Sequence, residues 1–497
     1  MVLLCACMLT KAQLIQGGGP VVESYNAENN DIQLISNGND DFVVYMAPKS
    51  YKSKFYHHQI LKYDKQSDVF TSKSLTLPAK NFCLLSFDAG DQYFAAYGCY
   101  PKNTQYEYRV AKFSKSFDEE KVTPELRFSM PVKYAGDVRE YAATSANGKY
   151  HALVLFSVNP NYKVGAFHCF LYDEQGNEVF YKSLTPEIYG GTFSVEDLIV
   201  DNAGVVYLLM ADGKQQNNFW ESSAVHLLKI TADRAEARAI PFQDGIVHSM
   251  KMLALKNNNL FIGGYFANKD HQPTCGYFSV IFDTKVEDFA VLKKEDFSAD
   301  QRPGIEQVLY VRAPYHTECK DIYQLENGNV VMLGENTCMV IKEDNGTTTY
   351  WYHKQNILYQ HFDENGTAMA EHILMKNQNI GSEWMLFERE CNGMTALGIG
   401  LSFSSFVKGN DVYVLYTDSK AHIPAQPSPA AVNVVLGRAK NCLNIAKLTE
   451  TNMIVQPVMD YAKSKNTFNR LWLFDGSKAY FGMYNLKEYT LENLEIE

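Results

Sequence analysis

The stretch Leu325-Glu326-Asn327-Gly328-Asn329-Val330-Val331-Met332-Leu333 combines a polar turn with an apolar strand that runs out of it. Asn-Gly can hold the positive φ values that a tight hairpin turn needs, and a run of β-branched and apolar residues suits a strand buried between neighbours. The arrangement occurs eight times, so a hairpin unit is the repeating element of the chain. The other turns are Asn37-Gly38, Ala89-Gly90, Asn147-Gly148, Ala203-Gly204, Asn257-Asn258, Lys408-Gly409 and Asp475-Gly476.

The spacing of these turns gives the size of the repeat. Intervals of 52, 58, 56, 54, 70, 81 and 67 residues separate Gly38, Gly90, Gly148, Gly204, Asn258, Gly328, Gly409 and Gly476. Periods above about 40 residues with several strands per unit are typical of propeller blades.

A second signature follows every hairpin except the last. An apolar strand ends in Asp, Ser or Thr, whose side chain can close a turn by bonding nearby backbone N–H groups. Another strand follows each of these turns, so each unit is predicted to hold four antiparallel strands. The seven copies are Tyr63-Asp64, Phe113-Ser114, Tyr172-Asp173, Ile230-Thr231, Phe282-Asp283, Phe362-Asp363 and Leu448-Thr449.

The two ends of the chain together supply the strands of one blade. Only 21 residues follow Gly476, which leaves room for two further strands, near 479–484 and 489–496. The segment Pro-Val-Val-Glu-Ser-Tyr at 20–25 precedes the first complete unit and has no partner of its own. A blade that mixes strands from both termini would close the ring and protect its sheet edges. The sequence therefore predicts an all-β fold, an eight-bladed β-propeller closed by its N- and C-terminal strands, with a seven-bladed ring and one stray hairpin as the alternative.

The first twelve residues form an apolar run that ends in small residues. We interpret 1–12 as the tail of a secretory signal without its basic part, cleaved after Ala12, although a buried terminal strand is the alternative. No other apolar run approaches the roughly 20 residues that span a bilayer. Residues 13–497 are then one propeller domain of an exported protein, periplasmic, at the cell surface or extracellular.

The charge and histidine content of the chain indicate which kinds of partner the protein does not bind. The 46 Lys and Arg residues against 57 Asp and Glu residues give a net charge of −11, which argues against a nucleic-acid surface. The 12 histidines show no zinc-type spacing, so we expect no bound metal and no cofactor. We expect a monomer.

The predicted irregular insertions, which include residues 212–221 and 336–354, gather at one end of the ring. The longer connections between the second and third strands, and between successive blades, emerge at the same face, while the hairpin turns at the other face are short. Aromatic residues in this elaborated face suit stacking on sugar rings or docking of a partner, and packing of the loops onto the ring is the alternative. The predicted ligand-binding residues are Tyr51, Tyr100, Tyr162, Trp220, Trp351 and Trp384.

Two cysteine pairs flank hairpin turns, Cys83 with Cys99 and Cys319 with Cys338. Each pair is centred close to its turn, so the side chains would oppose one another and form disulfides in an exported protein. Ordinary buried thiols are the alternative.

No catalytic motif stands out. The stretch 398–402, Gly-Ile-Gly-Leu-Ser, lacks the closing glycine of a nucleophile elbow, and no carboxylate pair can be singled out. We therefore favour a non-catalytic binding or scaffold protein that holds a glycan, peptide or protein partner on the elaborated face. The alternative is a propeller hydrolase or lyase that acts on carbohydrate.

The repeat as a whole resembles the β-propeller proteins exported by Gram-negative bacteria, and the Thr-Lys-Ala-Gln junction at 10–13 is similar to their signal-peptide ends. The resemblance covers nearly the whole chain and is architectural. The repeated motifs of WD40, kelch, Tyr-Trp-Thr-Asp and Asp-box propellers are absent, so no functional residue is carried over.

Overall fold

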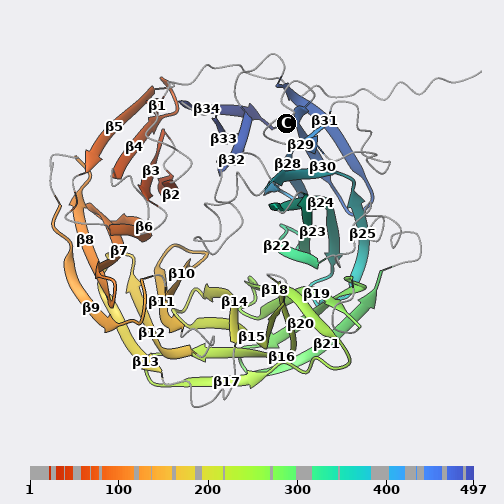
Figure 1. Ribbon diagram of the computed structural model, residues 1–497, viewed down its shortest axis with the longest axis horizontal. Helices are drawn as coiled ribbons and strands as arrows, with labels where there is room; N and C mark the ends of the chain where they lie inside the picture. The colour runs from red at the N-terminus through yellow and green to blue at the C-terminus, as the bar shows by residue number, and fades with distance from the viewer. Residues whose placement is uncertain are drawn as a thin grey trace, which may run out of the picture.

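The computed structural model describes residues 22–23, 30–37, 40–48, 58–67, 69–75, 77, 81–116, 122–135, 137–158, 164–184, 193–216, 219–268, 273–297, 316–344, 347–381, 402–419, 432–433, 441–461, 467–484 and 488–496. These residues form strands and their connections, with no helix among them. Eight four-stranded antiparallel blades surround one axis (Figure 1), which confirms the eight-bladed β-propeller.

Each blade runs from an innermost to an outermost strand. Blade 1 has β2 (Asn30–Asn37), β3 (Asp41–Pro48), β4 (His58–Asp64) and β5 (Val69–Leu75). Blade 2 has β6 (Asn81–Ala89), β7 (Gln92–Lys102), β8 (Gln105–Ser114) and β9 (Glu125–Pro131). Blade 3 has β10 (Val138–Thr144), β11 (Tyr150–Val158), β12 (Val164–Asp173) and β13 (Glu178–Leu184). Blade 4 has β14 (Phe193–Val200), β15 (Val206–Gln216), β16 (Phe219–Ile230) and β17 (Ala235–Ala239).

The second half follows the same order. Blade 5 has β18 (Ile246–Ala254), β19 (Leu260–Ala267), β20 (Gly276–Asp283) and β21 (Asp288–Asp296). Blade 6 has β22 (His316–Gln324), β23 (Val330–Asp344), β24 (Thr347–Phe362) and β25 (Ala368–Leu374). Blade 7 has β27 (Phe403–Lys408), β28 (Asp411–Ser419), β30 (Asn441–Leu448) and β31 (Met453–Asp460). Blade 8 has β32 (Thr467–Phe474), β33 (Lys478–Tyr484), β34 (Glu488–Glu495) and β1 (Val22–Glu23).

The ring is closed by the first strand of the chain. β1 lies antiparallel to β34, with Val22 opposite Tyr489 and Glu23 opposite Glu488. The last blade therefore takes three strands from the C-terminus and one from the N-terminus, as the sequence predicted. The hydrogen bonds of this pair join the two ends of the chain across the last blade.

The turns have the backbone conformations that their residues predict. The second turn residue has a positive φ in seven of the eight hairpins, and Gly38 lies outside the described residues. Six of these are glycines, and the seventh is Asn258 with φ 68°. The predicted side-chain turns are also confirmed; Asp173 Oδ1, for example, accepts from the N–H groups of Gln175 and Asn177 at 2.9 and 2.8 Å.

Successive blades pack face to face through alternate residues of their inner strands. On β23, Val331 and Leu333 pack toward blade 7, whereas Val330 and Met332 pack toward blade 5. All four side chains are fully buried. Each second strand thus contributes to two seams, the contact surfaces between neighbouring blades, and this explains its continuous apolar sequence.

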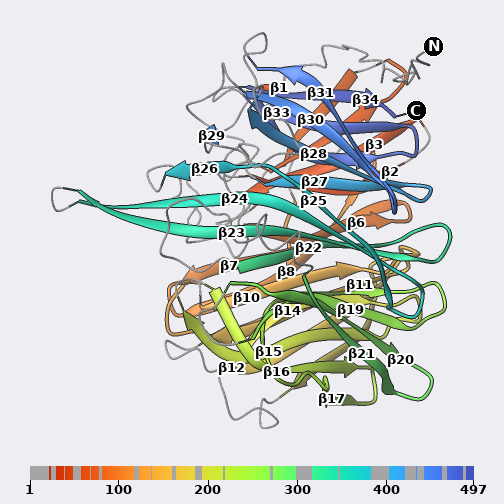
Figure 2. The ribbon, with the colours of Figure 1, turned by 90° about the vertical axis from the view of Figure 1, so that its right-hand side faces the viewer.

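Two predicted loops are regular hairpins instead. Residues 212–216 and 219–221 continue the β15–β16 ladder, and residues 337–344 and 347–354 continue the β23–β24 ladder as far as the pair Asp344 and Thr347. Figure 2 shows the β23–β24 hairpin projecting well beyond the other blades. β26 (Gln378–Gly381) pairs with β24 at the base of this hairpin, and β29 (Val432–Asn433) pairs in parallel with β26. We call the end of the ring from which it projects the loop face.

In the part of the chain that is described, no helix is long and apolar enough to cross a membrane.

Deleting residues 20–25 should destabilise the whole ring, because β34 loses its only neighbour on that side. We expect a lower melting temperature in a single cooperative transition, measured by circular dichroism against the full-length protein. Unchanged melting would contradict the role of β1 in closure.

Candidate functional site

The candidate site lies at the loop-face end of blade 6, where the seam with blade 7 changes from apolar to charged. The β23 residues that point into this seam are Val331, Leu333 and then Glu335. Glu335 is fully buried. Burying a carboxylate is costly unless it is paired and hydrogen-bonded, so its partners define the site.

Five groups of alternating charge form a chain of ion pairs. Lys376 Nζ lies 2.6 Å from Glu335 Oε1, and Lys354 Nζ lies 3.6 Å from Glu335 Oε2. The same Lys354 ammonium lies 2.7 Å from Glu318 Oε2, which Lys320 Nζ approaches at 3.4 Å. The three lysines and two glutamates alternate, so each charged group lies beside one of opposite sign. Their net charge is +1.

A bulge in β24 places Lys354 in this chain. Glu335 pairs with Ile357 and Thr337 pairs with Lys354, so two steps along β23 correspond to three steps along β24. In a regular strand, residues three apart lie on opposite faces. The extra residue turns Lys354 toward blade 7, on the same side as Ile357 and Glu335.

The same carboxylate fastens the chain on both sides of the connection between blades 6 and 7. Ser402 Oγ donates to Glu335 Oε2 at 2.5 Å, and Ser402 N donates to Gln378 Oε1 at 2.7 Å. Gln378 Nε2 in turn donates to the carbonyl of Thr417 in blade 7 at 2.6 Å. Ser402 has φ 80°, an unusual value for a residue with a side chain, which these contacts hold in place.

The pKa values show which groups in the chain are ionised. Burial tends to raise the pKa of Glu335, but Lys376 and Lys354 outweigh it and lower the value to about 2. The pKa of Glu318 is also lowered, because Lys354 and Lys320 outweigh its burial. Burial lowers the pKa of Lys376 although Glu335 opposes the shift. A carboxylate that stays ionised beside a lysine is a poor proton donor at neutral pH. We therefore assign the chain of ion pairs a structural role.

A second polar cluster lies on the other face of blade 6, toward blade 5. Thr317 Oγ1 donates to Asn336 Oδ1 at 2.8 Å, and Thr317 N donates to Thr274 Oγ1 at 3.0 Å. Thr274 Oγ1 also lies 2.8 Å from His248 Nδ1. Burial and the neighbouring His316 lower the pKa of His248 to about 3, so the ring is neutral.

The innermost strands of blades 3 and 4 carry carboxyl groups of a different kind. Burial raises the pKa of Glu140 to about 8 and also raises the pKa of Glu196 and Asp197. Glu196 accepts from Ser194 Oγ at 2.5 Å, and Asp197 accepts from Met252 N of the next blade at 2.9 Å. The described residues hold no group of three or more His, Cys, Asp or Glu side chains that could bind a metal ion.

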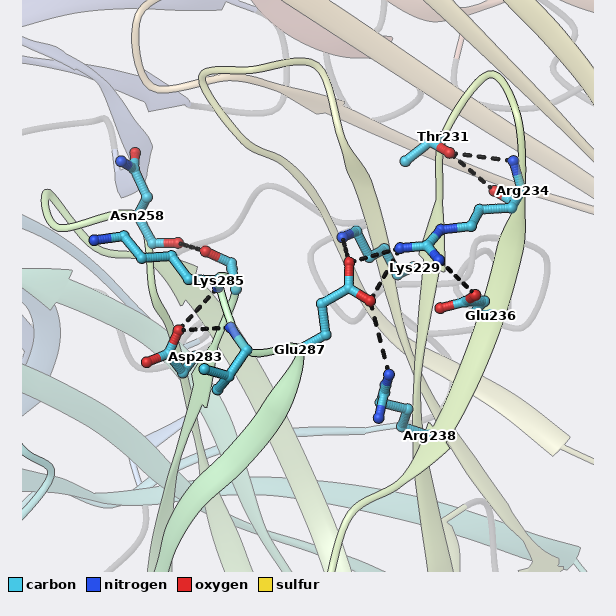
Figure 3. Close-up of polar contacts among 11 residues, drawn as sticks. Lys229, Thr231, Arg234, Glu236, Arg238, Asn258, Asp283, Lys285 and Glu287 are labelled. Carbon is cyan, nitrogen blue, oxygen red and sulfur yellow. Dashed lines mark hydrogen bonds and ion pairs between the residues drawn. The ribbon is translucent and has the colours of Figure 1, made fainter.

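The opposite end of the ring has an ion-pair cluster with a structural role. Figure 3 shows Glu287, in the last turn of blade 5, among three cations of blade 4. Its carboxylate lies 2.6 Å from Lys229, 2.7 Å from Arg234 and 3.7 Å from Arg238. These contacts join blade 4 to blade 5, and each of the three cations lies beside a carboxylate.

Most of the predicted aromatic residues cannot be placed as ligands. Tyr51, Tyr162 and Trp384 lie outside the described residues, and the side chains of Trp220 and Trp351 are not described. Their backbones lie in the extended hairpins, with Trp220 opposite Gln215 and Trp351 opposite Val340. Tyr100 is buried against Phe82 and Tyr106, with ring centroids 6.3 and 5.1 Å apart, which favours the packing alternative for this residue.

The cysteines are not aligned as the turn spacing predicted. A bulge in β6 places Cys83 opposite Tyr97 and Asn81 opposite Cys99. Cys99 is a free thiol 3.9 Å from Glu107 Oε2, and its burial beside that carboxylate raises its pKa to about 11. Cys319 is a free, buried cysteine opposite Gly334, and the side chain of Cys338 is not described. No bridge involves Cys99 or Cys319 in this structure, and oxidative pairing stays a prediction.

No protein-family model matches the chain, and no curated protein sequence matches it. Among solved structures, the propeller of Dos1 is 9% identical over 95% of this chain and 94% of its own, with a TM-score of 0.47. A PL25 ulvan lyase, described as a new family of polysaccharide lyase, is 10% identical over 95% and 96%, with a TM-score of 0.42. A puromycin-hydrolyzing peptidase from Mycobacterium tuberculosis is 9% identical over 95% and 61%, with a TM-score of 0.39. At these values no residue role transfers to this chain.

Replacing Glu335 by Gln should cost about 3–5 kcal/mol of unfolding free energy, because Lys376 and Lys354 remain buried without their shared carboxylate. The matched control is Asp41→Asn, which removes the partner of Lys62 in a more exposed pair and should cost about 0–1 kcal/mol. Urea unfolding at neutral pH measures both.

The pH dependence gives a second measure of the same pair. The folded pKa of Glu335 lies below its ordinary value of 4.5, so its stabilisation is complete above that pH and is lost as the pH falls toward about 2. The difference in stability between wild type and Glu335→Gln should therefore shrink across that range. Equal losses for Glu335→Gln and Asp41→Asn would contradict the assignment.

Proposed function

We propose that the protein is an exported, non-catalytic binding or scaffold protein that holds a glycan, peptide or protein partner on the loop face. The observation that supports this proposal most is the chemistry of the blade 6 end. Its ionisable groups are engaged with one another, whereas an enzyme must present an acid, a base or a metal to one substrate bond. A binder needs only a polar and aromatic surface, and the loop face supplies long hairpins for one.

The second candidate is a hydrolase or lyase that acts on carbohydrate. One observation favours it: burial raises the pKa of Glu140, on an innermost strand, to about 8, which is the direction of shift that a general acid needs. The side chains that act on its pKa are Arg139 and Tyr106, neither of which is a second carboxyl group or a histidine. Binding therefore remains the better supported proposal.

A combined glycan and peptide array tests the two candidates. We expect a specific signal without turnover, reduced about tenfold or more in Trp220→Ala, Trp351→Ala or Trp384→Ala, because exposed aromatic residues supply much of the contact energy in such sites. Circular dichroism melting of each variant is the control for folding. Turnover of any arrayed substrate would overturn the non-catalytic assignment, and binding that survives all three substitutions would place the partner elsewhere.

Export is part of the same proposal. It follows from the apolar segment 1–12 and its small residues before Gln13. N-terminal sequencing of protein from the native host should find Gln13, open or cyclised, at the mature terminus. Intact Met1 in a cytoplasmic fraction would contradict it.

A further inference from the structure

Tyr134 is the most exposed aromatic side chain in the part of the chain that the structure describes, with 56% of its surface accessible to solvent. It lies in the connection from β9 to β10, on the loop face, where the outermost strand of each blade ends. Leaving a large aromatic side chain in water forgoes the free energy that its burial would provide. An exposed aromatic residue on this face is therefore a candidate contact for a partner.

The backbone around Tyr134 is fixed. Its N–H donates to Asp137 Oδ2 at 2.7 Å, and the N–H of Asp137 donates to Tyr134 O at 3.2 Å. Val132, two residues earlier, is buried in the core shared by blades 2 and 3. A partner that binds the ring therefore has little backbone freedom to remove, which lowers the cost of binding.

Tyr181 shows the contacts of an exposed tyrosine that packs onto its blade. It is 42% exposed, but its ring stacks on Phe170 with centroids 4.7 Å apart, and its hydroxyl lies 3.0 Å from His168 Nδ1. Among the described residues, Tyr134 makes no such ring or hydroxyl contact. The group that lies over its ring is the ammonium of Lys133, with Nζ 5.2 Å from the ring centroid. Packing onto the blades therefore does not account for the position of Tyr134.

Two lysines at this end of blade 2 have no carboxylate partner. Lys133 and Lys102 are exposed, and neither forms an ion pair with a described residue. Lys102 ends β7, and the turn after it lies against the connection that carries Tyr134, because Val132 N–H donates to Thr104 O at 3.0 Å.

The local charge is positive although the net charge of the chain is −11. Lys102, Lys133 and Arg139 outnumber the acidic residues Asp137 and Glu140 in the two connections and the start of β10. Burial also raises the pKa of Glu140 to about 8, so its carboxyl carries less negative charge at neutral pH than an ordinary glutamate. Unpaired lysines around an exposed aromatic ring favour an anionic partner.

We propose that Tyr134, Lys133 and Lys102 form a binding site for a glycan that contains uronic acids, in which a sugar ring stacks on Tyr134 and its carboxylate pairs with a lysine. We call these three residues the Tyr134 platform. The inference deepens the proposed function and rests on it, since it chooses an anionic glycan among the partners.

The chemistry of a uronic acid matches both features of the platform. The C–H face of a sugar ring suits stacking on an aromatic ring, and a uronic acid carries its carboxylate on that same ring. An acidic peptide instead presents its carboxylates on side chains without an apolar ring. A lysine ammonium is a point charge on a flexible stem, so Lys133 can leave the ring face for a carboxylate beside it. The platform lies on the surface, where an extended glycan can reach it without an enclosed cavity.

The test is calorimetric titration of the full chain with short oligogalacturonates. Tyr134→Ala should weaken binding about tenfold or more, because the stacking contact is lost. Its melting temperature should stay unchanged, because the ring packs against no other described ring. Tyr134→Phe should keep the affinity, since stacking needs the ring and not the hydroxyl. Lys133→Gln should weaken binding up to about fivefold, as expected for an exposed charge pair.

Two variants and two probes serve as controls. Tyr181→Ala removes an exposed tyrosine outside the platform, and Lys285→Gln removes an exposed lysine in the β20–β21 turn at the opposite face. We expect both to keep the affinity for oligogalacturonate. Neutral hexose oligomers keep the sugar ring without the carboxylate, and poly-glutamate keeps the charge without the sugar ring. We expect each to bind at least about tenfold more weakly than oligogalacturonate.

The remaining outcomes separate this inference from the proposed function. Undiminished binding of oligogalacturonate by Tyr134→Ala would overturn the platform while the proposed function stands. Equal affinity for poly-glutamate or for the neutral oligomers would overturn the choice of a uronic acid. Binding of other arrayed partners but of no oligogalacturonate would likewise overturn the inference alone. Binding of no arrayed glycan or peptide and of no oligogalacturonate would overturn both.

Discussion

The structure depends on the face-to-face packing of successive blades. Each second strand, such as β23, presents Val331 and Leu333 to one neighbour and Val330 and Met332 to the other. No blade can bury both faces alone, because a single four-stranded sheet exposes whichever face has no neighbour. The ring closes where blade 1 packs against blade 8, with Phe42 and Val44 against Tyr480, and β1 adds the fourth strand of blade 8 from the other end of the chain. Closure and core formation are therefore one event.

The seam between blades 6 and 7 changes from apolar to charged along its length. Toward the short turns it is apolar, and toward the loop face it ends in Glu335, Lys354 and Lys376. Burying the charged part costs desolvation free energy that apolar residues would not cost. Its ion pair and hydrogen bonds fix the path of the chain, because Glu335 binds Lys376 and Ser402 on the two sides of one connection and Gln378 also binds Ser402. The fixed end of blade 6 then carries the long β23–β24 hairpin.

Much of the fold could be predicted because its signals are local. Positive φ at Gly328 or Asn258, and an Asp such as Asp173 that closes its own turn, depend only on a few neighbouring residues. The candidate site could not be predicted, because Glu335, Lys376 and Ser402 are far apart in sequence and meet only through the ring. A bulge decided the orientation of Lys354, and another shifted Cys83 away from the register that turn spacing predicts. The length of the insertion at 336–354 is typical of an irregular loop, and its only hairpin signal in the sequence is the pair Asn345-Gly346.

The central claim is that seam packing and closure make the eight blades one cooperative unit. Native-state hydrogen exchange in increasing denaturant tests it most directly, because it reports the opening free energy of each second strand separately. We predict that the slowest amides of β3, β7, β11, β15, β19, β23, β28 and β33 exchange with the same opening free energy. An opening of β3 and β33 well below that of β19 would contradict the claim, because it would mean that the blades at the ends of the chain separate while the rest of the ring stays folded.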